Sequence, residues 1–128
     1  MEKSIKEIED YLAGVKAAVK RGRWQIERNK KRQANLALFR EYVIDERRCR
    51  QIILELSAYD FSSILQNEHA GYEQEQLYVF GTEVSLLQRF GERMDIVPLY
   101  IKLNRLEEPF VIVVSFHRQA RVLKYAFR

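Results

Sequence analysis

Residues 109–119 read PFVIVVSFHRQ, and this stretch decides the fold. Five consecutive apolar residues, from Phe110 to Val114, leave the strand without a polar face. That pattern is typical of a strand covered on both faces, inside a sheet. The apolar run then stops at Ser115 and His117 and turns basic. We therefore expect a central strand over residues 110–116, whose end either emerges into solvent or carries chemistry.

The rest of the chain predicts helices first and strands afterwards. Apolar residues recur at helical spacing from Ile5 to Val19, and Gly22 is a plausible helix stop. Asp45 is a candidate N-cap for a later helix. Further elements are expected as follows: a short strand or extended link at 23–27, strands at 75–84, 96–104 and 123–127, a second helix near 34–43, a third helix after Asp45 to Leu56, a loop at 57–72, and a short helix or insertion at 85–95. This order predicts one α+β domain over residues 1–128, with N-terminal helices packed on one face of a small, mostly antiparallel sheet.

The composition is that of a globular protein. The chain has 128 residues, of which 47% are hydrophobic, enough to bury a core. No apolar stretch approaches the ~20 residues that a membrane span needs, and the charged first twenty residues do not resemble a secretory signal. The single cysteine, Cys49, cannot form an internal disulfide, so a cytoplasmic location is the default expectation. Cys49 occupies an apolar helical position, where packing is a simpler role than nucleophilic chemistry.

Basic residues are grouped along the chain. Residues 20–32 hold seven Lys or Arg against one acid, and residues 109–128 hold four against none. Grouped positive charge indicates a polyanion partner such as RNA. A mixed, solvated surface is the plainer alternative that charge alone leaves open.

The hairpin of strands 96–104 and 110–116 brings polar side chains together. Pro109 cannot donate a ladder hydrogen bond, so it belongs in the turn. With Arg105 opposite Phe110, Lys102 faces Val113 and Tyr100 faces Ser115. His117 then lies diagonally from Tyr100 on the same face, within side-chain reach. A slip of one residue would separate them.

These residue types suit cleavage of a phosphodiester by the neighbouring ribose 2′-OH. Histidine changes charge near neutral pH, so His117 is the candidate that moves a proton. Lys102 and an arginine would stabilise charge on the phosphate, and Tyr100 would contact phosphate or base. We name His117, Tyr100 and Lys102 as candidate catalytic residues. The candidate RNA-binding residues are Arg118, Arg121, Lys124 and Tyr78. A histidine at a strand end is, taken alone, more often structural.

No other type of site is indicated. The two histidines, His69 and His117, and Cys49 show no metal-ligand spacing. No glycine-rich phosphate loop or Gly-x-Ser-x-Gly motif occurs. We therefore expect neither metal nor cofactor.

Four segments together resemble one known family. They are RRCRQIILELSAYDF at 47–61, LYVFGTEV at 77–84, PLYIKLNRLEEPFVIVVSFH at 98–117 and VLKYAFR at 122–128. In this order and with similar gaps, they resemble the MqsR family of toxins from bacterial toxin–antitoxin pairs. The similarity covers about residues 30–128.

The resemblance implies a RelE-like α+β fold and a metal-independent endoribonuclease that cuts messenger RNA; the ribosome is a further candidate partner. It also implies a cognate antitoxin that holds the enzyme inactive. His117 falls where the family carries a basic residue, often lysine, and Tyr100 falls on the tyrosine of the matching strand. A lysine that some members carry after the Asp-Phe motif is Ser63 here, so Lys102, Arg118 or Arg121 would have to supply its charge.

Three functions stay open on the sequence. The leading one is an RNA-cleaving toxin that acts through His117. The second is an RNA- or ribosome-binding module of the same fold that does not cut. The third is a protein-interaction domain whose basic surface serves an acidic partner.

Overall fold

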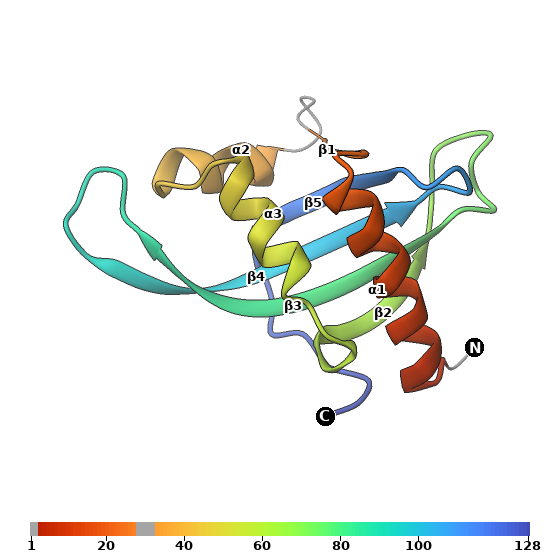
Figure 1. The fold of residues 1–128 in the computed structure, drawn as a ribbon. Helices are drawn as coiled ribbons and strands as arrows, with labels where there is room; N and C mark the ends of the chain where they lie inside the picture. Colours follow the sequence, from red (N-terminus) through yellow and green to blue (C-terminus); the bar gives the residue numbers. More distant parts are fainter. Residues whose placement is uncertain (1–2, 28–32) are drawn as a thin grey trace.

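The computed structural model describes residues 3–27 and 33–128, which form helices on one face of a five-stranded sheet (Figure 1). The prediction of a basic cluster over residues 20–32 lies partly outside the described residues. The elements in chain order are α1 (Ile5–Lys20), β1 (Trp24–Ile26), α2 (Gln33–Glu41), α3 (Glu46–Leu54), the 3-10 turn η2 (Ala58–Asp60), β2 (Phe61–Gln66), β3 (Gln76–Leu87), β4 (Met94–Arg105) and β5 (Val111–Arg118). The predicted α+β class is confirmed.

Local sequence signals set the helix ends. Ser4 and Glu7 form a capping box at the start of α1, and Asp45 caps α3 by accepting a hydrogen bond from the Arg48 N–H. Gly22 ends the first helical segment with φ +75°, a conformation that glycine adopts without strain. Cys49 is fully buried in α3, as its apolar position predicts.

The strands lie in the order β1-β5-β4-β3-β2, and only the β1–β5 pair is parallel. The predicted interior strand is therefore confirmed, because β5 has a neighbour on each side. The long β3–β4 hairpin projects beyond the helices, at the left of Figure 1. Residues 85–95 extend β3 and β4 around a turn and do not form the short helix that was one of the two expectations.

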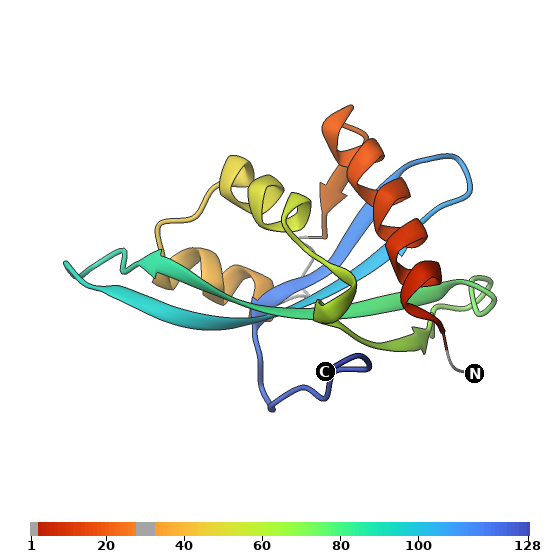
Figure 2. The same ribbon diagram turned by 60° about the horizontal axis from the view of Figure 1, so that its bottom comes forward.

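Two other predictions are wrong. Residues 57–72 were expected to be loop, yet they include η2 and β2, which pairs with β3. Residues 123–127 were expected to be a strand, yet they form an irregular segment. This C-terminal segment, residues 119–128, crosses the sheet on the side away from the helices, as Figures 1 and 2 show. Its alternating apolar residues pack onto the sheet, and one backbone hydrogen bond, from the Ala126 N–H to the Phe61 carbonyl at 3.0 Å, ties it to the start of β2.

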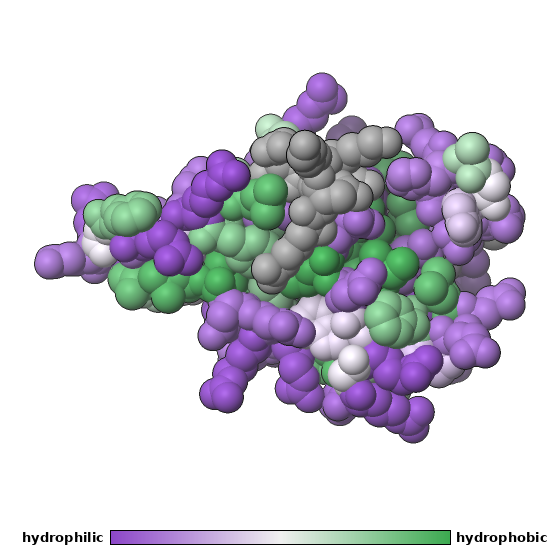
Figure 3. Space-filling model, turned by 90° about the horizontal axis from the view of Figure 1, so that it is seen from above, coloured by the Kyte–Doolittle hydropathy of each residue, from purple (hydrophilic) through white to green (hydrophobic). Residues whose placement is uncertain are grey.

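The main core lies between the helices and one face of the sheet. Side chains of alternate strand residues, such as Ile101, Leu103, Val113 and Phe116, point into it and are fully buried. The residues between them point to the opposite side, which we call the open face; it carries Tyr100, Lys102 and His117. Figure 3, seen from above, also shows apolar surface on the projecting hairpin, where Leu87, Phe90, Met94 and Ile96 are exposed.

Candidate functional site

Tyr100 and His117 form the centre of the open face. They are direct partners across β4 and β5, and their rings stack with centroids 5.1 Å apart and planes 10° from parallel. The sequence predicted the shared face but placed Tyr100 opposite Ser115, with His117 on the diagonal. The structure corrects this register: Ser115 lies opposite Lys102.

A β-bulge explains the corrected register. Leu103 pairs with Val113 and Lys102 pairs with Ser115, so Val114 is an extra residue in β5. The strand pairing also starts one residue later than the prediction, with Arg105 opposite Val111. The late start and the bulge together shift the register by two residues. A shift of two residues leaves each side chain beyond the bulge on its predicted face but gives it a different partner across the strands.

Asn35 of α2 holds the bulge from the helix side. Its Nδ2 donates to the Val114 carbonyl at 3.3 Å and its Oδ1 accepts from the Phe116 N–H at 2.8 Å. The pairing of β1 with β5 ends at Val113, so this fully buried side chain takes the place of a neighbouring strand. Sequence reasoning missed this role, because an asparagine within an amphipathic helix carries no local signal for it.

The hydrogen bond of His117 sets the tautomer of its neutral ring. Its Nδ1 lies 2.7 Å from the Arg118 carbonyl oxygen. A carbonyl oxygen can only accept, so Nδ1 carries the proton, and Nε2 of the neutral ring keeps a lone pair. The ring is partly exposed at the end of β5, beyond the residues that pair with β1. Nε2 is therefore arranged as a proton acceptor.

A row of side chains lies beside the stacked pair. Ser63, Val79, Lys102 and Ser115 are consecutive partners across β2, β3, β4 and β5. Lys102 is half-buried, and Ser115 is buried at 3% exposure. The row puts Ser63 two strands from Lys102, roughly 10 Å at the usual strand spacing. Residue 63, where some members of the resembled family carry lysine, thus lies on the open face in the same row as Lys102.

The C-terminal segment forms one wall of the site. A Cβ added at Gly81, the β3 partner of Tyr100, would lie 2.5 Å from the Tyr125 hydroxyl and 2.6 Å from Leu123 Cδ1. Gln119 anchors the segment, because its side chain donates to the Leu99 carbonyl at 3.0 Å and its N–H donates to the Pro98 carbonyl at 2.8 Å. A glycine within a strand is the sequence signal for such a close approach.

Arg121 and Lys124, two of the candidate RNA-binding residues, belong to this wall. Arg121 is exposed and lines a cavity of 440 Å³ together with Pro98, two residues before Tyr100 on β4. Lys102 is two residues after Tyr100. The cavities that Arg121 and Lys102 line therefore lie on opposite sides of Tyr100 along β4. Lys124 is exposed, and its carbonyl accepts from the Ser62 hydroxyl at 2.6 Å.

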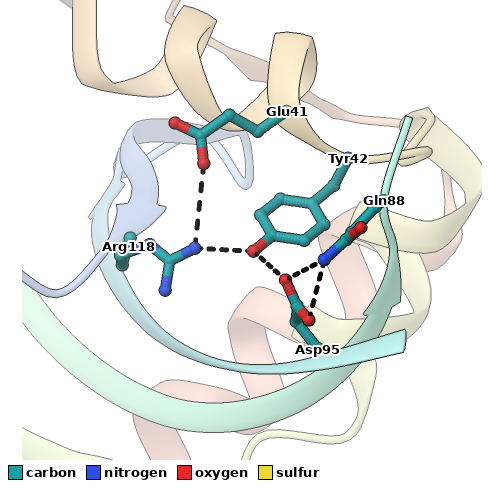
Figure 4. Close-up of polar contacts among 5 residues, drawn as sticks. All are labelled: Glu41, Tyr42, Gln88, Asp95 and Arg118. Atoms are coloured by element: carbon teal, nitrogen blue, oxygen red, sulfur yellow. Dashed lines mark hydrogen bonds and ion pairs between the residues drawn. The ribbon is translucent and has the colours of Figure 1, made fainter. Parts of the chain in front are cut away.

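Arg118, one of the candidate RNA-binding residues, points away from the open face. Its guanidinium donates to the Tyr42 hydroxyl at 2.6 Å and lies 3.7 Å from the Glu41 carboxylate, on the side of α2 (Figure 4). Neighbouring residues of a strand face opposite sides of the sheet, and His117 takes the open face. Arg118 therefore does not supply the charge missing at Ser63.

The contacts of Arg118 extend to the base of the projecting hairpin. The Tyr42 hydroxyl donates to Asp95 at 2.8 Å, and Gln88 donates to both oxygens of the same carboxylate at 3.1 Å (Figure 4). These hydrogen bonds, that of Gln88 first, hold the pKa of Asp95 below its usual value. Burial, with the hydrogen bond to Asp95, raises the pKa of Tyr42. The network ties α2 to β4 and β5.

Tyr78 is also on the wrong side for RNA. Its ring stacks on Tyr11 of α1, with centroids 3.7 Å apart, and its side chain is buried in the main core. Its position in β3 opposite Leu103 fixes this orientation. The structure therefore gives Tyr78 a packing role.

Over residues 3–27 and 33–128, no group of three or more His, Cys, Asp or Glu side chains is arranged to hold a metal ion. No helix among the described residues is both long and apolar enough to cross a membrane. Comparisons of the chain with protein-family models, with curated proteins and with solved structures found no match. The geometry of the open face and the resemblance in sequence are therefore what indicates a function for this protein.

Proposed function

We propose that this protein is an endoribonuclease that cuts messenger RNA without a metal ion, through attack of the ribose 2′-OH on the adjacent phosphodiester. The observation that carries the proposal is the stacked Tyr100–His117 pair, in which Nε2 of His117 faces away from the hydrogen bond at Nδ1. A histidine held in one tautomer by a second contact is arranged for proton transfer.

Each residue of the site has a role in this reaction. Nε2 of His117 takes the proton from the 2′-OH as the oxygen attacks phosphorus. The bond to the 5′-oxygen breaks and that oxygen takes a proton from solvent water, while His117 returns its proton to solvent, so the products are a 2′,3′-cyclic phosphate and a 5′-hydroxyl. Lys102 and Arg121, one on each side of the pair, stabilise the charge that grows on the phosphate oxygens. Tyr100 orients the imidazole by stacking and contacts the substrate.

The open face supports this assignment in a second way. Its floor is a sheet, and its two walls are the C-terminal segment and the β2–β3 loop, residues 67–75. Side chains held on strands are positioned more accurately than side chains on loops, and this reaction depends on positioning and charge. The wider expectations from the resemblance, namely action as a toxin in the cytoplasm, a possible need for the ribosome and a cognate antitoxin, belong to the same proposal.

Purified protein incubated with a long messenger RNA in EDTA tests the proposal. We expect discrete cuts that end in 2′,3′-cyclic phosphate. His117→Gln, which keeps an amide N–H for the Arg118 carbonyl but cannot shuttle a proton, should lower the rate about 10²–10⁴-fold. Circular dichroism and thermal unfolding check that the variant folds.

Two outcomes contradict the proposal. Equal cutting by wild type and His117→Gln would assign the cleavage to another residue or to a contaminant. No cutting by either protein, on free RNA and on translating ribosomes, would favour the RNA-binding module, for which salt-sensitive affinity for intact RNA is the expected property.

A further inference from the structure

A second cavity lies on the open face, beneath the β2–β3 loop. Its volume is 310 Å³, at the lower end of the range for small-ligand pockets and suited to one flat ring system. Its floor includes Leu77 of β3 and Ile112 of β5, whose side chains point to the open face. His69, Tyr72 and Glu75 of the loop form a wall. The cavity thus combines an apolar floor, aromatic rings and two carboxylates, that of Glu75 in the loop and that of Glu27 after β1.

Glu75 is held in one orientation. Its Oε1 accepts from Asn67 Nδ2 at 3.1 Å and from Asn104 Nδ2 at 3.0 Å. Asn104 is only 5% exposed, so this amide is fixed within the sheet. No donor from residues 3–27 or 33–128 makes a hydrogen bond to Oε2. A carboxylate oxygen has two acceptor sites, so Oε2 can accept two further hydrogen bonds.

The loop that carries Glu75 is closed by its own hydrogen bonds. The Asn67 N–H donates to the Glu75 carbonyl, the Tyr72 N–H to the His69 carbonyl, and the Glu75 N–H to the Tyr72 carbonyl, each at 3.0 Å. Gly71 takes φ +90° at the turn, a conformation that glycine adopts readily. The wall of the cavity is therefore formed before any ligand arrives, which lowers the entropy cost of binding.

The cavity is continuous with the proposed catalytic surface. A neighbouring cavity of 400 Å³ is lined by Lys102 and shares Asn67, His69 and Leu77 with the first. A path over the open face thus leads from the stacked Tyr100–His117 pair, past Lys102, to Glu75. A nucleotide whose phosphate lies at Lys102 can place its base in the cavity.

We propose that this cavity is a nucleobase subsite that selects guanine, with Glu75 as the residue that determines specificity. The Watson–Crick edge of guanine carries two adjacent N–H donors, at N1 and N2, which match the two acceptor sites of Oε2. Adenine and cytosine place a ring-nitrogen acceptor beside their amino group, and uracil places a carbonyl on each side of its N–H. Tyr72 and the apolar floor contact the faces of the ring.

This assignment rests on the proposed RNA cleavage for its biological meaning, but base binding can be measured without cleavage. Isothermal titration of the full chain with GMP, AMP, CMP and UMP is the first experiment. We expect GMP to bind most tightly. Glu75→Gln keeps an oxygen for Asn67 and Asn104 and replaces Oε2 by a donor, so GMP affinity should fall tenfold or more, about 1.4 kcal/mol or more. Glu92→Gln, at the far hairpin turn, makes the same charge change and should leave binding unaltered.

Cleavage mapping on a long messenger RNA completes the test. Wild type should cut next to guanine, and Glu75→Gln should lose that preference while His117→Gln retains the GMP affinity. Equal binding of the four nucleotides, no binding of GMP, or an unaltered Glu75→Gln would overturn the subsite. GMP binding that depends on Glu75 in a protein that never cuts RNA would keep the subsite and overturn the proposed cleavage.

Discussion

Tyr100 and His117 stack across the two central antiparallel strands, with ring centroids 5.1 Å apart, while Nδ1 of the histidine bonds the Arg118 carbonyl. The two contacts fix the plane of the imidazole and its tautomer. The arrangement separates two possible contributions of Tyr100, the ring that orients His117 and the hydroxyl that contacts RNA.

Substitution of Tyr100 distinguishes these contributions. Tyr100→Phe keeps the stack and removes the hydroxyl, whereas Tyr100→Ala removes both. If orientation of the imidazole is the main contribution, Phe should retain most of the cleavage rate and Ala should lose about a hundredfold, since small misplacements of a catalytic group are costly. Single-turnover cleavage of a defined RNA measures both. A rate for Phe as low as that for Ala would assign the contribution to the hydroxyl.

Ser63→Lys should raise the cleavage rate. Residue 63 belongs to the row of partners that includes Lys102, and an added ammonium on the open face strengthens the field around the phosphate. We expect a gain that shrinks as salt concentration rises, because salt screens exposed charges. Ser85→Lys, on the exposed part of β3, is the control, because it adds the same charge outside the row that contains Lys102. An equal gain in both variants would indicate general attraction of RNA.

Asn35→Ala should destabilise the protein and disturb the site from the helix side. The change leaves the Val114 carbonyl and the Phe116 N–H without their partner in a buried place, at a cost of about 1–3 kcal/mol for each unsatisfied group. Chemical denaturation measures the free energy of unfolding. Gln25→Ala, at an exposed position of β1, should have little effect. A loss below about 0.5 kcal/mol for Asn35→Ala would mean that water replaces the amide.

Gly81→Ala should lift the C-terminal segment from the sheet. The added methyl would overlap the Tyr125 hydroxyl and Leu123 Cδ1, which lie on the segment that walls the site. Hydrogen exchange of residues 119–128 should become faster while exchange in the main core stays slow. Ser85→Ala on the same strand is the control. Unaltered exchange in the segment would show that its side chains move aside without loss of contact.

The Tyr42–Asp95 contact predicts a dependence of stability on acid. The pKa of Asp95 is lowered in the folded protein by hydrogen bonds from Gln88 and Tyr42. The ionised Asp95 carboxylate therefore contributes fully to the free energy of unfolding above the pKa of an ordinary aspartate, about 4. This contribution is lost as the pH falls through the pKa of Asp95 in the folded protein. Asp95→Asn should flatten this part of the stability curve. If wild type and Asp95→Asn lost stability equally as the pH fell, Asp95 would not be the source of the dependence.

Much of the fold followed from local sequence signals, and the physical reason is that these signals act over a few residues. Helical spacing, the stop at Gly22 and the cap at Asp45 predicted helices, and the apolar run after Pro109 predicted an interior strand. Short elements were harder to predict from the sequence. Strand β2 was missed because its alternation is weak, and residues 123–127 alternate like a strand although they pack on a face.

The sequence by itself determined the α+β class, the helix ends and the presence of Tyr100, Lys102 and His117 on one side of a hairpin, because the alternation of strand residues is intrinsic to the backbone. Only the tertiary structure decided which residues became partners. Asn35, far away in the chain, holds the bulge that puts His117 opposite Tyr100. Strand alternation then turned Arg118 and Tyr78 to the helix side, where Tyr42 and Tyr11 meet them. Such long-range packing has no local signature, and it selected the residues that line the open face.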